Sequence, residues 1–168
     1  MKILGISCYY HDSAAALIDK GELVAAAQEE RFSRKKHDAN FPILAINFCL
    51  QEAGISAKEL DYAVFYEKPF KKFERIALSS LATAPRAYEL FYQSYQSWLR
   101  EKLWIKEKIA KILKIPANKI LFSEHHLSHA ASAFYTSPFE RAAILTADAV
   151  GEWSTTSWGI GIDKKIHL

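Results

Sequence analysis

Two histidines, His125 and His129, lie four positions apart in a segment with helical character. Residues i and i+4 of a helix share one face, so both imidazoles can point to the same place. A third residue, Asp148, directly follows the apolar run 142–147, which is typical of a buried strand. Two imidazoles and one carboxylate can bind a divalent cation such as Fe2+, Mn2+ or Zn2+, and they leave positions open for substrate. The three residues therefore predict a metal site that carries out chemistry.

A structural interpretation of the same histidines is open. A chain with six histidines can place two of them four residues apart by chance, and a helix also uses histidine for capping or for core hydrogen bonds. The position of Asp148 at the end of a predicted strand favours the metal site, because ligands of α/β sheets gather at strand ends.

A second pair with chemical potential, His11 and Asp12, lies between the first two predicted strands. A histidine beside a carboxylate can act as a general base near neutral pH, which makes both residues catalytic candidates. The alternative is a polar turn in which Asp12 binds its own backbone. The sequence does not decide between the two.

Other residues could bind substrate. The charge-dense loop after the third predicted strand contains Arg31, Arg34 and Lys35, which could clamp a phosphate, although such a run is usually a solvated loop. Further along, Gly151 allows close approach of the backbone to a ligand. The neighbouring Glu152 could polarise a substrate hydroxyl or only solvate the turn.

Hydrophobic patterns predict the elements that position these residues. Strands are expected at 2–8, 13–18, 22–28, 60–66, 119–122, 141–147 and 154–160, with helices from Pro42 to Gly54, over most of 70–115, and around the two histidines. A tight hairpin turn is expected at 19–22. The lysine-rich part of the helical segment, 101–114, should pack by its apolar face with the lysines in water. The alternative is a lid whose lysines attract an anionic substrate.

This order of elements favours an α/β fold with the mixed five-stranded sheet of the actin-like ATPase (ribonuclease-H-like) fold and an inserted helical segment at about 70–115. In that fold the first hairpin and a later hairpin hold ligand between them. The chain ends within a predicted hairpin, so residues 1–168 are expected to be the first part of a longer N-terminal domain.

Composition excludes several classes of protein. A length of 168 residues corresponds to about one domain, and a formal net charge of +3 is too small to indicate a nucleic-acid partner. Cys8 and Cys49 lie in apolar stretches and are expected to be reduced, buried thiols of a cytoplasmic protein. The first residues are not expected to act as a secretory signal, because His11 and Asp12 interrupt their apolar run, and the uncharged stretches are too short for a membrane span. The sequence also lacks the motifs of P-loop NTPases, dinucleotide enzymes, zinc ribbons and α/β-hydrolases.

Four segments, taken in order, resemble the N-terminal domain of the O-carbamoyltransferases of the nodulation-factor and cephamycin type, the NodU/CmcH family. These segments are Gly5–Ala16, Gln28–Pro42, His125–Phe134 and Asp148–Trp153. Singly the motifs are modest, but four in order make a specific match that covers nearly the whole chain.

The resemblance implies a two-step reaction in a protein more than three times this long. Carbamoyl phosphate and ATP give carbamoyl-adenylate, and a hydroxyl of a small-molecule acceptor then takes the carbamoyl group. The nucleotide-binding domain that forms the adenylate would follow this domain and is absent from this chain. The fragment alone is therefore expected to be inactive.

The resemblance also implies roles for individual residues. His125, His129 and Asp148 match the family's metal ligands, and a further Asp ligand belongs to a later segment. His11 matches the histidine of the family's first turn and is the best candidate for activating the acceptor hydroxyl. One position departs from the family pattern, because Ala149 stands where Gly usually follows the metal Asp, and its methyl would crowd a ligand at that turn.

Two other functions compete with this hypothesis. One is another actin-like enzyme, either a phosphotransferase or the tRNA threonylcarbamoyl-transferase, although the latter would need a more basic surface than +3 provides. The other is a non-catalytic module that binds metal or nucleotide. The sequence leaves the acceptor and the oligomeric state open, a homo-oligomer included.

Overall fold

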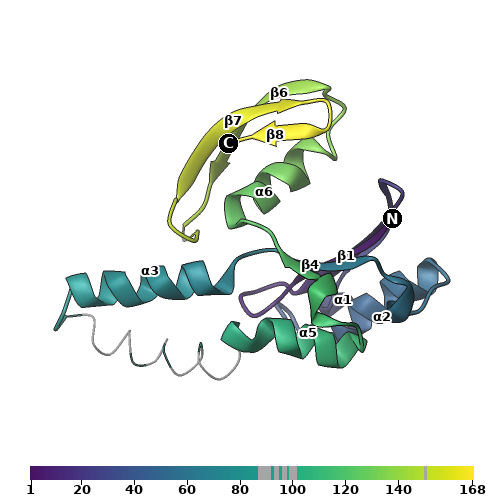
Figure 1. Ribbon diagram of the computed structural model, residues 1–168, viewed down its shortest axis with the longest axis horizontal. Coiled ribbons are helices and arrows are strands. Elements are labelled where there is room, and N and C mark those ends of the chain that lie inside the picture. The colour runs from purple at the N-terminus through teal and green to yellow at the C-terminus, as the bar shows by residue number, and fades with distance from the viewer. Residues whose placement is uncertain (87–91, 93–94, 96–97, 99–101, 150) are drawn as a thin grey trace. The chain divides into compact units, whose positions relative to one another are not determined.

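The computed structural model describes residues 1–86, 92, 95, 98, 102–149 and 151–168 of the chain. These residues form two compact units (Figure 1). The first unit contains Met1–Tyr66 and Trp104–Phe122, and the second contains Glu67–Leu103 and Ser123–Leu168. None of the helices in the described part of the chain has the length and apolar character that crossing a bilayer requires.

The first unit is built on a mixed five-stranded sheet. Its strands are β1 (Lys2–Ser7), β2 (Ala14–Asp19), β3 (Glu22–Gln28), β4 (Tyr62–Phe65) and β5 (Ile120–Phe122), in the order β3-β2-β1-β4-β5. The β1–β2 and β2–β3 pairs are antiparallel, whereas β1–β4 and β4–β5 are parallel. The structure therefore confirms the predicted α/β class and the mixed five-stranded sheet of the actin-like fold.

The hairpin between β2 and β3 follows from two residues. Lys20 and Gly21 have φ values of 53° and 91°, and positive φ at both central positions is the signature of a type I′ turn. This turn matches the right-handed twist of the strands that it joins, so it fixes the start of the antiparallel meander as predicted.

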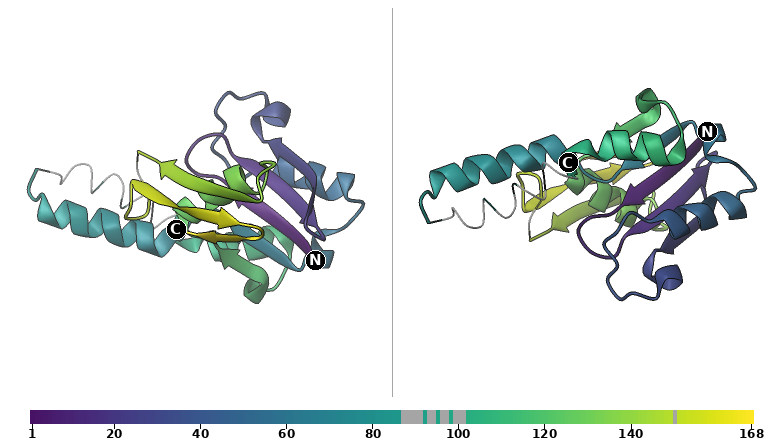
Figure 2. Two further views of the ribbon diagram at one scale, coloured as in Figure 1. Left: turned by 90° about the horizontal axis from the view of Figure 1, so that it is seen from above. Right: turned by 90° about the horizontal axis from the view of Figure 1, so that it is seen from below.

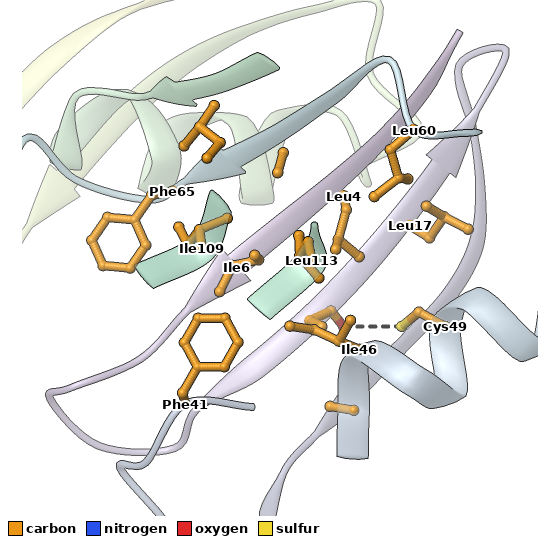
Figure 3. Packing of buried hydrophobic residues seen from close by; sticks show 14 of the residues in the cluster. Leu4, Ile6, Leu17, Phe41, Ile46, Cys49, Leu60, Phe65, Ile109 and Leu113 are labelled. Carbon is orange, nitrogen blue, oxygen red and sulfur yellow. Dashed lines mark hydrogen bonds between the residues drawn. The ribbon is translucent and has the colours of Figure 1, made fainter. Parts of the chain in front are cut away.

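Two helices, α2 (Ile43–Glu52) and α5 (Ile105–Leu113), cover one face of this sheet (Figures 2 and 3). Buried side chains from both helices and from the strands form a single cluster. On α5 the buried residues Ile105, Ile109 and Leu113 recur every four positions, while Lys111 is exposed. Core packing, rather than a lid, therefore explains α5. Cys8 and Cys49 are also buried in this unit and form no disulfide.

The charge-dense segment after β3 was predicted to be a loop. The structure shows that it contains the short helix α1 (Glu30–Ser33). The helix forms because the carbonyl of Glu29 accepts a hydrogen bond from the Ser33 amide at 2.9 Å. The Glu29 carboxylate is buried and accepts hydrogen bonds from the Leu44 and Ala45 amides at 3.1 and 2.8 Å. Glu29 therefore satisfies the first turn of α2, where backbone donors lack helical partners.

The second unit contains a three-stranded antiparallel sheet, which the sequence did not identify as a separate sheet. Its strands are β6 (Arg141–Ala147), β7 (Thr156–Ile162) and β8 (Lys165–His167). The helix α6 (His125–Phe134) packs on it, with Ala130, Phe134 and Ile144 as the buried cluster. Gly161 is required there, because a Cβ would lie 2.5 Å from the Phe134 ring.

The other elements of the described part of the chain are helical. The second unit also contains α3 (Pro69–Ala82), whose Phe73 lies 6.0 and 6.3 Å, between ring centroids, from Tyr95 and Trp98. The short 3-10 helices are η1 (Ala57–Glu59), η2 (Lys102–Trp104) and η3 (Ala117–Lys119). The predicted helical segment at 70–115 is thus divided between the units, and 87–101 is described only at Tyr92, Tyr95 and Trp98.

Candidate metal centre

The structure brings together the three predicted metal ligands, all within the second unit. Nε2 of His125 lies 2.7 Å from Oδ2 of Asp148 and 3.1 Å from Nε2 of His129. The third side of the triangle, from Nε2 of His129 to Oδ2 of Asp148, measures 3.9 Å. The three side chains therefore present one ligand atom each to a common point.

The size of this triangle suits a transition-metal ion. The circle through the three atoms, drawn from these three distances, has a radius of about 2.0 Å. Zinc bonds to imidazole nitrogen and carboxylate oxygen are ~2.0–2.2 Å long, so an ion can reach all three atoms from a position within about 1 Å of the plane of the triangle. Three ligands leave the remaining coordination positions for substrate or water.

Two secondary-structure elements fix the ligands. His125 is the first residue of α6, and His129 follows one turn later on the same helical face. Asp148 directly follows β6, and its amide donates a hydrogen bond of 2.8 Å to the carbonyl of Thr155. Because α6 packs on β6, the helix start and the strand end meet at the same edge of the unit.

A buried ion pair lies beside His125 on the side away from Asp148. Oε2 of Glu67 is 3.4 Å from Nδ1 of His125 and 2.6 Å from Nζ of Lys72. All three side chains are largely buried, with exposed fractions of 6% for Glu67, 10% for His125 and 11% for Lys72. The sequence did not indicate this pair, although Glu67 follows shortly after β4, much as Asp148 follows β6.

The charges of the centre shift its protonation equilibria. The Glu67 carboxylate raises the pKa of His125 above its ordinary value, against the effects of burial and of Lys72, and Asp148 adds to the rise. Burial and the neighbouring His125 lower the pKa of His129. Burial alone would raise the pKa of Asp148, but the hydrogen bond from His125 lowers it overall. A cation that binds the centre therefore competes with a proton for His125, and this competition extends to a higher pH than for an ordinary histidine.

Metal affinity should consequently depend on pH in two stages. A metal ion must displace the His125 proton, and the raised pKa of His125 means that this competition begins above pH 6.5. As the pH falls below that pKa, affinity should drop about tenfold per unit, and the drop should steepen only below pH 6.5, where His129 also gains a proton. Zn2+ titrations between pH 8 and pH 5.5 measure this profile. An affinity that is flat over this range contradicts the assignment of His125 as a ligand.

His126, between the two predicted ligands, has a different task. Its Nδ1 lies 2.8 Å from Oγ1 of Thr146 and 2.6 Å from Oγ of Ser157, so the ring ties α6 to β6 and β7. A Cβ on Gly151 would lie 2.8 Å from Nε2 of His126 and closer still to the Ser154 carbonyl. The protein's own packing therefore requires Gly151, which was predicted to make room for a ligand.

Glu152 and Ala149 flank the turn after Asp148. The Glu152 carboxylate is buried and accepts a 2.6 Å hydrogen bond from the amide of Lys68, so its observed role is to hold the turn. This hydrogen bond explains the buried position of the carboxylate, and the role of Glu152 in polarising a substrate hydroxyl stays a prediction. The Ala149 amide donates a hydrogen bond to the Asp148 carboxylate, and the Ala149 side chain is exposed.

His11 and Asp12 lie in the first unit, between β1 and β2, and are in contact as predicted. Nδ1 of His11 is 2.7 Å from one carboxylate oxygen of Asp12, and Nδ1 of His37 is 2.8 Å from the other. The hydrogen bonds from His37 and His11 lower the pKa of Asp12, and the Asp12 carboxylate raises the pKa of His37. The sequence did not single out His37, since its contact with Asp12 arises only in the folded chain.

The loop after β3 folds against the β1–β2 connection. The amide of Tyr9 donates to the Ala39 carbonyl at 2.9 Å, and that of Ser13 donates to the Asp38 carbonyl at 2.8 Å. On the same loop the three candidate phosphate ligands, Arg31, Arg34 and Lys35, are all exposed. They are thus available to an anion, and the phosphate clamp stays a prediction.

Comparison with known proteins gives these motifs a context. Residues 2–167 match the family described as Carbamoyltransferase N-terminus. An uncharacterized protein of Synechocystis sp. is 57% identical over 162 residues, which cover 92% of this chain and 26% of that protein. The nodulation protein NolNO of Sinorhizobium fredii is 33% identical over 161 residues, which cover 94% of this chain and 22% of that protein.

A solved structure of YeaZ from Pseudomonas aeruginosa is also similar, with a TM-score of 0.49 and 15% sequence identity over 99% of this chain and 63% of that one. The chain spans about a quarter of the length of the two curated relatives described above. The family match covers nearly every residue, including both histidines and the aspartate of the candidate metal centre. The chain therefore belongs to the family of carbamoyltransferase N-terminal domains.

Proposed function

We propose that this chain is the metal-binding part of an O-carbamoyltransferase. The enzyme would form carbamoyl-adenylate from carbamoyl phosphate, water and ATP with release of phosphate and pyrophosphate, and transfer the carbamoyl group to a hydroxyl of a small-molecule acceptor. An adenylate-forming domain outside this chain would supply the first step. The observation that carries the proposal is the convergence of His125, His129 and Asp148 in a chain of this family.

The side chains of the centre have complementary roles in this proposal. His125, His129 and Asp148 would hold Fe2+, Mn2+ or Zn2+, and such an ion can orient a phosphate and polarise the acceptor oxygen. In the transfer step the acceptor oxygen bonds to the carbamoyl carbon, and the bond from that carbon to the phosphate oxygen of AMP breaks.

His11 is the proposed general base of that step. Its Nδ1 is 2.7 Å from Asp12, which favours the tautomer with the proton on Nδ1 and a lone pair on Nε2. Nε2 can then accept the proton of the attacking hydroxyl. Arg31, Arg34 and Lys35 are the proposed partners of the substrate phosphates, for which guanidinium and ammonium groups are well suited.

Radiolabelled carbamoyl phosphate tests the proposal. The longest natural protein that contains this chain, given ATP, a divalent metal and a panel of sugar acceptors, should form a labelled carbamoyl ester and AMP. His11→Ala should lower turnover by about 100-fold or more, since general-base catalysis contributes that much, while metal binding is retained. The chain alone should give no turnover. Robust turnover by the chain alone, or full turnover by the His11→Ala variant, contradicts the proposal.

A further inference from the structure

Glu67 is a buried carboxylate that contacts one cation and one proposed metal ligand. Its Oε2 atom faces both Nζ of Lys72, at 2.6 Å, and Nδ1 of His125, at 3.4 Å. The second distance exceeds the ~2.7–2.9 Å of a charge-assisted hydrogen bond, so a shift of about half an ångström would complete it. Lys72 pairs this carboxylate, but a buried ion pair contributes little net stability, so the placement needs a further reason.

The tautomer of His125 supplies that reason. If Nδ1 carries its proton toward Glu67, Nε2 is left with a lone pair directed at the other two ligand atoms. Three electron-rich atoms, two imidazole nitrogens and one carboxylate oxygen, would then face one another at 2.7, 3.1 and 3.9 Å. Such atoms repel unless a cation or a proton lies among them.

We propose that Glu67 is the positioning residue of this metal centre. Its carboxylate accepts the Nδ1 proton of His125, fixes the ring, and so directs the Nε2 lone pair at the metal ion. Lys72 holds the same carboxylate oxygen in place through its ammonium group. The inference rests on the proposed metal binding, and it adds a residue whose loss should weaken the centre without removing a ligand.

Metal titration of the full chain tests the proposal with a matched control. Glu67→Gln should weaken Zn2+ binding about 10- to 100-fold, as loss of the group that orients a metal-bound histidine typically does. Glu124→Gln removes the same charge next to the start of α6, but the Glu124 carboxylate binds Lys68 and Lys71 and no proposed ligand. The Zn2+ affinity of the Glu124→Gln variant should stay within about threefold of that of the wild type, because exposed ion pairs contribute little. Equal losses of Zn2+ affinity in the two variants would mean that Glu67 acts only as a nearby negative charge, and would overturn the proposal.

A second pair of variants covers the case in which Glu67→Gln fails to fold. Glu67→Met combined with Lys72→Met replaces the buried ion pair by apolar side chains, an exchange that is often neutral for stability. Lys72→Met alone keeps the carboxylate. The double variant should bind Zn2+ about 10- to 100-fold more weakly than Lys72→Met, and equal affinities would contradict the proposal.

Proton NMR of the Zn2+-loaded chain separates this inference from the proposed function. With Nε2 bound to the ion, the Nδ1 proton of His125 should resonate further downfield in the wild type and in Lys72→Met, which keep the carboxylate acceptor, than in the double variant. Equal resonance positions in the three chains would overturn the role of Glu67 even though metal binds. No Zn2+ binding by the wild type would instead reject the metal centre itself.

Discussion

Replacing His129 with Ala is expected to weaken divalent-metal binding by about 100-fold or more, since a direct ligand should contribute at least as much as the group that orients one. The exposed fraction of the His129 side chain is 52%, so its removal leaves no cavity in the core. The other two ligand atoms remain 2.7 Å apart but can no longer enclose an ion. Isothermal titration with Zn2+ or Mn2+ measures the change in affinity, and thermal unfolding without metal checks that the fold is retained.

His167→Ala is the matched control, because it removes an exposed histidine of the same unit from β8, outside the candidate centre. Its metal affinity should equal that of the wild type. If His129→Ala binds metal as tightly as His167→Ala does, the ion is held elsewhere and the proposed centre is wrong.

Ile109→Ala should strongly lower the stability of the first unit. Ile109 is fully buried on α5 and belongs to the same cluster as Leu4 and Ile46 (Figure 3). Truncation of a buried isoleucine typically costs about 2–5 kcal/mol, because transfer energy is lost and a cavity remains. The free energy of unfolding, from urea denaturation followed by circular dichroism, measures the loss.

Lys111→Ala, two residues away on the exposed side of α5, should change the free energy of unfolding by less than about 0.5 kcal/mol. This comparison tests the packing of the lysine-rich helix. A small loss for Ile109→Ala would mean that α5 does not belong to the core and would return the lid interpretation to consideration.

Much of the fold could be predicted because local signals agree with the final structure. The turn at Lys20 and Gly21 fixes the meander, and the apolar spacing of Ile105, Ile109 and Leu113 gives the buried face of α5. The short helix α1 was missed because its four residues lie in a run of charges that is also typical of a loop. The separate sheet β6-β7-β8 could not be recognised, because strand order is set by tertiary pairing and not by pattern.

The residues of the candidate sites likewise divide into those that the sequence could predict and those that it could not. His125, His129 and Asp148 could be found because helical spacing and a strand end place them on predictable faces. Glu67 and His37 could not, since each meets its partner across 58 or 25 positions of the chain, as in the contacts Glu67–His125 and His37–Asp12. Gly151 and Glu152 had visible signals, but their contacts with His126 and Lys68 show that the turn needs them for its own structure.

A crystal of the chain soaked with Zn2+ and measured at the zinc absorption edge tests the central claim most directly. The account predicts one anomalous peak about 2.0–2.2 Å from Nε2 of His125, Nε2 of His129 and a carboxylate oxygen of Asp148. A peak bound to other residues, or imidazole rings turned away from Asp148 with no ion between them, would contradict it.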